Sequence, residues 1–147
     1  MTEHPYLATI RRYYDGCNRG DIDLMISTFT PDVVHYFSDS HLPPEQRGPI
    51  RGAAALAKYW ASWQKGGQAA RWSVDHGIVE GNEAVIEWSV VLTGPRGGNR
   101  RLLRGTEWYV FRRGKIAEVR AYYHYTSRTT VNELGSFPYA RRGYPVT

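Results

Sequence analysis

The sequence predicts an α+β protein in which three helices precede a run of β-strands. Apolar and aromatic side chains recur at helical spacing in the first 64 residues, and from residue 72 they alternate with a period of two. The chain of 147 residues has the length of one domain, so we expect a single domain over residues 1–147. A curved antiparallel sheet with the helices across its concave face would enclose a cone-shaped cavity, which suits a small molecule.

Two helices are expected at the N-terminus. The first covers residues 5–18, where the side chains on one face are apolar or aromatic. Gly20 can end this helix, and Asp21 can cap a second helix whose apolar face extends to Phe29. Pro31 then excludes any continuation of the second helix.

A short strand and a third helix complete the helical half of the chain. The strand is expected over residues 33–38, and the loop HLPPEQRGP separates it from a helix over residues 52–64. The side chains expected on the inward face of this helix are Leu56, Trp60 and Trp63.

The second half of the chain predicts four antiparallel strands joined by short turns. The strands cover residues 72–78, 84–92, 101–111 and 116–125, and the turns are the segments GNE, GPRGGN and RRGK. The tail over residues 126–147 has no clear period but keeps several aromatic side chains. We expect it to pack on the body of the domain or at the mouth of the cavity.

Composition excludes several classes of protein. No apolar run approaches the roughly 20 residues of a membrane span, and the single cysteine excludes a disulfide scaffold and a cysteine-ligated metal site. The formal net charge is +5, but the basic residues are scattered and no nucleic-acid-binding motif accompanies them. Because the N-terminus also lacks the features of a signal peptide, we expect a cytoplasmic protein that binds neither nucleic acid nor a membrane. Aromatic residues reach 14% of the chain, which favours either a ring-lined pocket or an adhesive surface.

Three segments carry a resemblance to one superfamily. The stretch YYDGCNRGDIDLMISTFTPDVVHY, the segment GPIRGAAALAKYW and the hairpin EWYVFRRGKIAEVRAYY resemble the SnoaL-like and ketosteroid-isomerase-like proteins of the nuclear transport factor 2 (NTF2)-like superfamily. Together they span nearly all of residues 5–125, and they consist mostly of turns and core positions. The resemblance therefore implies the NTF2-like cone more strongly than it implies any one activity.

The same resemblance implies a class of function. It implies binding of a small hydrophobic molecule that carries an oxygen function, cyclic or polyketide-like, followed by a cofactor-free acid/base isomerisation, cyclisation or dehydration. The alternative is a non-catalytic ligand-binding or assembly domain of the same fold. Relatives commonly dimerise through the outer face of the sheet, which implies a homodimer here.

Two positions of the isomerase-like active site hold residues with suitable chemistry. Tyr13 lies seven residues before Gly20, where the relatives carry their catalytic tyrosine, and Glu107 lies at the position of their proton-bearing carboxyl. A phenol and a protonated carboxyl can both donate a hydrogen bond to one oxyanion, provided that apolar surroundings raise the pKa of Glu107. The alternative is a structural role, in which Tyr13 fills the core and Glu107 pairs with one of the many arginines, of which Arg104 is near in sequence.

The general base is the position where the sequence departs from the relatives. Their aspartate at this position corresponds to Phe37. His35 and Asp39 lie two residues to either side and share one face of the strand. Histidine titrates near neutral pH, so His35 is the first candidate for a base or acid and Asp39 is the second. The alternatives are a hydrogen-bonded core histidine and a turn-forming aspartate.

Aromatic side chains are expected to form the walls of the cavity. The residues expected to bind the substrate are Phe37, Trp60, Trp88, Tyr109 and Tyr123. On the last strand, Arg120 and Tyr122 fall on the opposite, outer face of the sheet. No cofactor is implied, and no metal site is expected, because the spacing of His35, His76 and Glu107 does not force them together.

Overall fold

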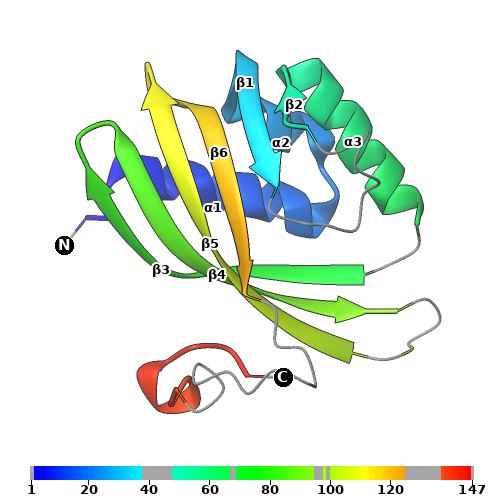
Figure 1. Cartoon of the computed structure of the whole chain (residues 1–147), viewed down its shortest axis with the longest axis vertical. Helices are drawn as coiled ribbons and strands as arrows, with labels where there is room; N and C mark the ends of the chain where they lie inside the picture. The colour runs from blue at the N-terminus through cyan, green and yellow to red at the C-terminus, as the bar shows by residue number, and fades with distance from the viewer. Residues whose placement is uncertain are drawn as a thin grey trace.

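A computed structural model of the chain describes residues 2–37, 48–66, 69–94, 98, 100–124 and 137–146. Its helices are α1 (Pro5–Arg19), α2 (Ile22–Ser27), α3 (Ala53–Lys65) and the short 3-10 helix η4 (Ala140–Arg142). Its strands are β1 (Phe29–Phe37), β2 (Ile50–Arg51), β3 (Ala69–Glu80), β4 (Glu83–Thr93), β5 (Arg100–Arg112) and β6 (Lys115–His124). The strands form one sheet in the order β2-β1-β6-β5-β4-β3 (Figure 1), so the α+β class is confirmed.

Local capping explains where the first two helices begin and end. His4 caps α1, because its side chain accepts a hydrogen bond from the backbone N–H of Tyr6. Gly20 ends α1 with a φ of 67°, a left-handed conformation that glycine adopts without strain. Asp21 caps α2 by accepting a hydrogen bond from the backbone N–H of Leu24 at 2.9 Å. Both N-terminal helices predicted from the sequence are therefore confirmed.

The sheet is mixed, which corrects the prediction of an antiparallel sheet. β1 runs parallel to β6, whereas every other pair of neighbouring strands is antiparallel. The strands from β3 to β6 follow one another through short connections, and such hairpins impose antiparallel pairing. β1 is separated from β6 by α3 and three long strands, so no turn determines its direction.

β1 begins earlier than the sequence predicts. Phe29, expected on the apolar face of the second helix, is already the first residue of the strand. Pro31 lies where the pairing with β6 is irregular, between Phe29 and Val34. Proline has no N–H to donate to a neighbouring strand, so it is tolerated at such an irregularity. The short strand β2 is not predicted, because two residues show no period; it pairs with β1 at Val34 and His35.

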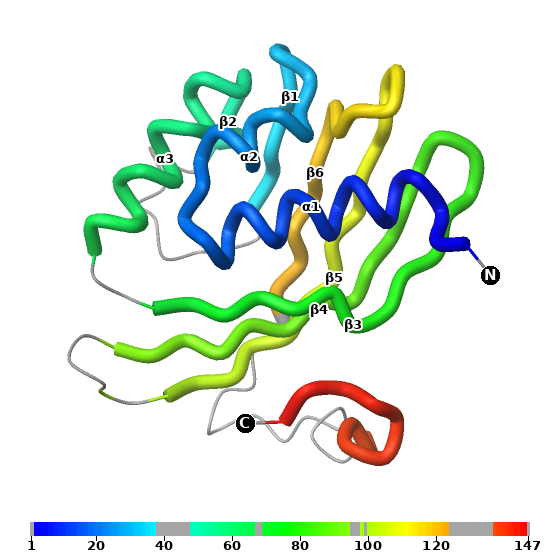
Figure 2. Tube along the Cα trace, turned by 180° about the vertical axis from the view of Figure 1, so that it is seen from behind, coloured from blue at the N-terminus to red at the C-terminus, as the bar shows by residue number. Residues whose placement is uncertain are grey.

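The three helices cover the inner face of the sheet and bury the core between the two layers. α1 crosses behind the strands in Figure 1 and in front of them in Figure 2. Ile10 of α1, Leu56 of α3 and Ile86 of β4 have no exposed surface. None of the helices in the described ranges is long and apolar enough to span a bilayer.

The inner face has no room for a side chain at Gly105 of β5. A Cβ atom there would overlap the indole ring of Trp88 and the carbonyl oxygen of Tyr122. Gly105→Ala is therefore expected to lower the free energy of unfolding by about 3 kcal/mol. Gly48→Ala is the control, because a Cβ atom at Gly48 meets no atom of the described residues within 4 Å, apart from its chain neighbours. Urea denaturation of both variants tests the prediction, and equal stabilities would contradict it.

The described part of the tail, residues 137–146, lies against the outer face of the sheet. The hydroxyl of Tyr144 donates a hydrogen bond to Oε1 of Glu87 on β4 at 2.7 Å. On β5, the guanidinium of Arg104 lies 3.8 Å from the ring centroid of Tyr139 and donates to the carbonyl oxygen of Pro145 at 2.7 Å. These contacts place the tail over β4 and β5, on the side of the sheet opposite the helices.

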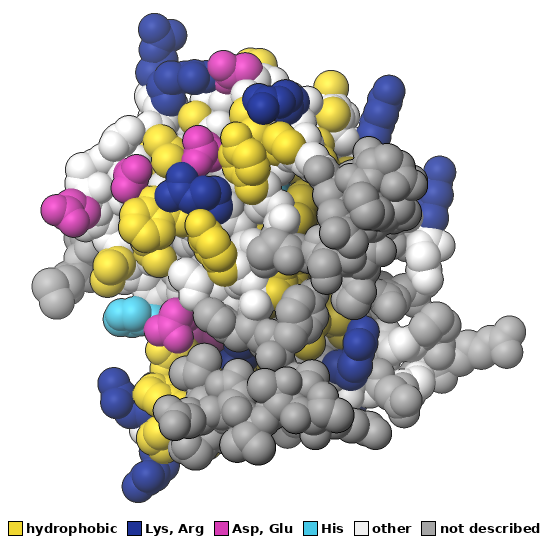
Figure 3. Space-filling view, viewed as in Figure 1, with side chains coloured by type: hydrophobic (Ala, Val, Ile, Leu, Met, Phe, Trp, Pro, Cys, Tyr) yellow, Lys and Arg dark blue, Asp and Glu magenta, His cyan; other side chains and the backbone are white. Residues whose placement is uncertain are grey.

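The outer face of the sheet also carries exposed rings, and Figure 3 shows apolar side chains there among charged ones. Tyr36 and Tyr122 are 39% and 46% exposed. The guanidinium of Arg120 lies 5.2 Å from the ring centroid of Trp108. Exposed rings beside arginines are typical of protein contact surfaces, and the homodimer expected through this face stays a prediction.

Candidate functional site

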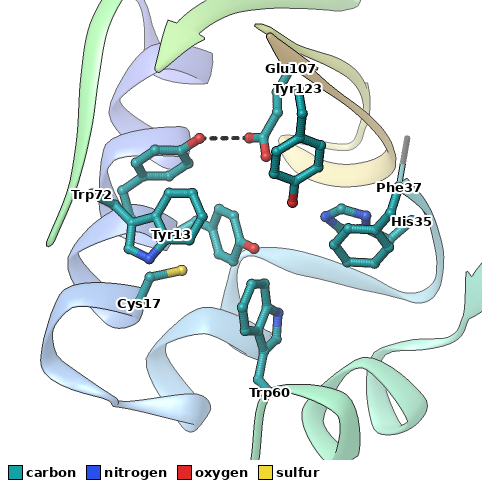
Figure 4. Close-up of a pocket in the computed structure, with 9 residues that line it drawn as sticks. Tyr13, Cys17, His35, Phe37, Trp60, Trp72, Glu107 and Tyr123 are labelled. Atoms are coloured by element: carbon teal, nitrogen blue, oxygen red, sulfur yellow. Dashed lines mark hydrogen bonds between the residues drawn. The ribbon is translucent and has the colours of Figure 1, made fainter. Parts of the chain in front are cut away.

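A pocket lies between α1, α3 and the inner face of the sheet (Figure 4). Its lining side chains come from two helices and four strands, and most of them are aromatic. They are Tyr13, Tyr14, Cys17, His35, Phe37, Trp60, Trp72, Glu107 and Tyr123. The free volume of the pocket is about 10 Å³, close to what a single water molecule needs.

Strand pairing explains how β5 and β6 both contribute to the pocket. Glu107 of β5 lies opposite Ala121 of β6, and Tyr123 of β6 lies opposite Gly105 of β5. Each large side chain therefore faces a small residue on the neighbouring strand, which leaves room for both on the inner face.

Glu107 is a buried carboxyl group held by two phenols. The residue is only 6% exposed, and Oε2 accepts a hydrogen bond from the hydroxyl of Tyr14 at 2.8 Å and another from the hydroxyl of Tyr109. Burial raises the pKa of Glu107 to about 7, although the hydrogen bonds from Tyr109 and Tyr14 act in the opposite direction. The carboxyl group therefore exchanges its proton near neutral pH.

The ion pair considered as an alternative for Glu107 is not formed. Arg104 lies on the outer face of β5, where it contacts Tyr139 and the carbonyl oxygen of Pro145. Both hydrogen bonds to Glu107 end on Oε2, and Figure 4 shows the other carboxyl oxygen turned toward the pocket. This second oxygen is the one that can meet a ligand.

Tyr13 lines the pocket, but of the two consecutive tyrosines of α1 it is Tyr14 that donates a hydrogen bond to Glu107. Tyr13 is 2% exposed and makes an edge contact with Phe29 at 5.0 Å between ring centroids. Burial raises the pKa of Tyr13 well above its usual value, so its hydroxyl stays protonated. The sequence gives no sign that Tyr14 is the partner, because two consecutive residues of a helix can both face the sheet.

His35 lies inside the pocket wall and is electrically neutral. It is 1% exposed, and its ring stacks on Phe37 at 4.0 Å between centroids. Burial lowers the pKa of His35 to about 3, although an interaction with the backbone of Tyr36 opposes the shift. A histidine with such a pKa is a weak base at neutral pH.

The residues expected to bind substrate divide into two sets. Phe37, Trp60 and Tyr123 line the pocket. Trp88 and Tyr109 are buried but are not among the lining residues. Trp88 instead packs behind the wall of the pocket, with its ring centroid 5.2 Å from that of Tyr123 and 5.4 Å from that of Trp72. Tyr109 donates a hydrogen bond to Glu107.

Trp72 lines the pocket although the sequence gives it no role beyond its place in a strand. Asp39, the second candidate for the base, lies outside the described residues. Within the described ranges, no group of three or more His, Cys, Asp and Glu side chains could hold a metal ion.

Comparisons with known proteins agree with this architecture. A family model described as "SnoaL-like domain" matches residues 10–119. A protein of unknown function with a cystatin-like fold from Methylobium petroleophilum PM1 is 34% identical, with a TM-score of 0.64 over 100% of this chain and 95% of its own. An NTF2-like protein of unknown function from Burkholderia pseudomallei K96243 is 18% identical, with a TM-score of 0.72 over 83% of this chain and 92% of its own. TerC, co-crystallised with polyporic acid, is 21% identical, with a TM-score of 0.73 over 82% of this chain and 92% of its own. No match is found among curated proteins.

Proposed function

Because the chain belongs to the SnoaL-like domain family, we propose that it binds a small hydrophobic molecule that carries an oxygen function. The proposed ligand is cyclic or polyketide-like, and the proposed reaction is a cofactor-free isomerisation, cyclisation or dehydration. TerC was co-crystallised with polyporic acid, which supports a small-molecule role for a pocket in this fold. We infer that the sheet and helices enclose a cone-shaped cavity of which the described pocket is a part.

The buried carboxyl group of Glu107 is the observation that carries this proposal. With a pKa of about 7, it is present in both protonation states near neutral pH. A group whose pKa lies near the working pH is best suited to general acid/base catalysis. A large fraction of it is in the required protonation state, and the driving force for proton transfer is still sufficient. Glu107 is therefore the proton carrier in the proposed reaction.

Tyr13 and His35 take supporting roles in the proposed site. Figure 4 shows the hydroxyl of Tyr13 directed toward the middle of the pocket, where it can donate a hydrogen bond to a developing oxyanion. His35, with a pKa of about 3, is too weak a base to compete with Glu107 for a substrate proton at neutral pH. We therefore assign His35 to ligand contact rather than to proton transfer.

A non-catalytic ligand-binding or assembly domain is the second candidate, and the small size of the pocket favours the assembly role. A free volume of about 10 Å³ does not admit a cyclic organic molecule, whereas ligand pockets usually measure several hundred Å³. Binding of a substrate therefore requires side chains of the wall to move. If they do not move, the polar groups of the pocket serve only to satisfy one another.

Ligand screening followed by product analysis separates the two candidates. Neutral polycyclic alcohols and ketones are titrated into the protein, with tryptophan fluorescence as the readout, because Trp60 and Trp72 line the pocket. Each bound compound is then incubated with the protein and analysed by mass spectrometry and NMR. A product of unchanged mass indicates isomerisation or cyclisation, and loss of one water indicates dehydration. Binding without conversion of any compound would favour the non-catalytic domain.

Tyr14→Phe is expected to raise the pKa of Glu107 above its present value of about 7. The hydrogen bond from Tyr14 stabilises the charged carboxylate, and its loss is expected to raise the pKa by about one. Tyr13→Phe is the matched control, since the bonds found to Glu107 come from Tyr14 and Tyr109. The carboxyl carbon resonance of Glu107, followed by NMR against pH, gives the pKa of each variant. A shift in Tyr13→Phe but not in Tyr14→Phe would reverse the assignment.

A further inference from the structure

Two buried polar atoms of the pocket have no hydrogen-bond partner among the described residues. They are Nε1 of Trp60 on α3 and Nδ1 of His35 on β1. Trp60 is 8% exposed and His35 is 1% exposed, so neither is solvated from outside. An unpaired buried polar group destabilises a protein, so each instance in a native structure calls for an explanation.

Both side chains line the same pocket, at a distance from its carboxyl group. Figure 4 shows Glu107 on one side of the pocket, Trp60 on the opposite side and His35 between them along the wall. The stack on Phe37 holds the His35 ring in place. The pocket therefore has an acid/base end at Glu107, and its unpaired nitrogen atoms extend from His35 on the wall to Trp60 at the opposite end.

The two nitrogen atoms define the chemical group that can pair with them. An indole N–H only donates, so the partner of Trp60 has to be an acceptor. Nδ1 of a neutral imidazole donates or accepts according to its tautomer. A carbonyl oxygen can accept from both rings, and a hydroxyl group can accept from Trp60 and donate to His35.

A charged group does not suit this end of the pocket. Neither lysine nor arginine is among the lining residues of the described pocket. Burial also keeps His35 neutral at physiological pH. A carboxylate or phosphate would therefore enter without a cation among the described lining residues, which is strongly unfavourable in an apolar environment.

We propose that Trp60 and His35 bind a neutral carbonyl or hydroxyl oxygen, so that the ligand is a flat molecule with an oxygen function at each end. The aromatic rings of the wall, including Phe37 and Trp72, favour a flat ring system between the two oxygens. The inference rests on the proposed binding of a small molecule and specifies the class of that molecule.

Isothermal titration with three related probes tests the inference. Naphthalene-2,6-diol carries an oxygen at each end, 2-naphthol carries one, and 6-hydroxy-2-naphthoate replaces one hydroxyl by a carboxylate. The diol is expected to bind about tenfold more tightly than 2-naphthol, because one more hydrogen bond to the protein is made. The naphthoate is expected to bind more weakly than the diol.

Substitution of the indole identifies the residue responsible. Trp60→Phe keeps an aromatic ring but removes Nε1–H. It is expected to reduce the ratio of the affinities for the diol and for 2-naphthol from about ten to about one. Trp63→Phe is the matched control on the same helix, because Trp63 is partly buried but is not among the lining residues. His35→Phe provides a second variant should Trp60→Phe fail to fold.

The outcomes separate this inference from the proposed reaction. A preference that Trp60→Phe and His35→Phe leave unchanged would overturn the inference, as would equal weakening of all three probes. Failure of every probe to bind the unmodified protein would overturn it together with small-molecule binding. Loss of the preference in Trp60→Phe, with no conversion of any compound, would support the inference and reject the catalytic proposal alone.

Discussion

Glu107→Gln is expected to lower kcat at least about 100-fold on a compound converted by the unmodified protein, while the protein stays folded. A positioned general acid or base typically contributes about 100-fold to 10,000-fold to a rate. Glutamine has the same shape, and its side-chain oxygen can still accept hydrogen bonds from Tyr14 and Tyr109. The substitution therefore removes the transferable proton and leaves the hydrogen-bonded geometry in place.

Two further variants show whether the loss is specific to the proton. Glu80→Gln makes the same chemical change at an exposed position of β3 and is expected to leave kcat unchanged. Phe37→Ala removes part of the apolar wall, so it is expected to raise KM more than it lowers kcat. Full activity of Glu107→Gln would reject Glu107 as the proton carrier.

The pH dependence of kcat/KM identifies the direction in which Glu107 works. Its pKa of about 7 predicts that kcat/KM changes with pH near neutrality, as one limb of the pH profile. A rate that rises with pH through this limb means that the carboxylate acts as a base, and a rate that falls means that the acid form donates the proton. The limb is expected to disappear in Glu107→Gln.

The helices could be predicted from the sequence because their boundaries depend on neighbouring residues. Gly20 and Asp21 act within one turn of their own positions, so local rules identify them. The parallel pairing of β1 with β6 depends instead on segments about 80 residues apart, and no local rule describes that contact. The two-residue strand β2 exists only because β1 is there to pair with it.

The candidate site shows the same division between local and distant information. The period of two on β1 correctly groups His35 with Phe37, and both line the pocket. The choice between Tyr13 and Tyr14 as the partner of Glu107 depends on how α1 lies across β5, which the helical period does not reveal. The low pKa of His35 also follows from burial by other elements, which the pattern along β1 does not reveal.

His35 and Glu107 are expected to make opposite contributions to the pH dependence of stability. The pKa of His35 falls from 6.5 to about 3 on folding, so between these values the unfolded chain binds more protons and stability rises with pH. The pKa of Glu107 rises from 4.5 to about 7 on folding, so between these values the folded chain binds more protons and stability falls with pH. The two slopes cancel between pH 4.5 and 6.5, which hides both effects in the unmodified protein.

His35→Asn and Glu107→Gln are expected to reveal these two slopes with opposite signs. Relative to the unmodified protein, His35→Asn gains about 3 kcal/mol in the free energy of unfolding as the pH falls from 6.5 to 4.5. Glu107→Gln gains a similar amount as the pH rises from 4.5 to 7. Urea denaturation at several pH values measures both differences, and the groups that titrate equally in all variants cancel. A flat curve for His35→Asn would mean that the pKa of the imidazole is the same in the folded and unfolded states, which would contradict its lowering by burial.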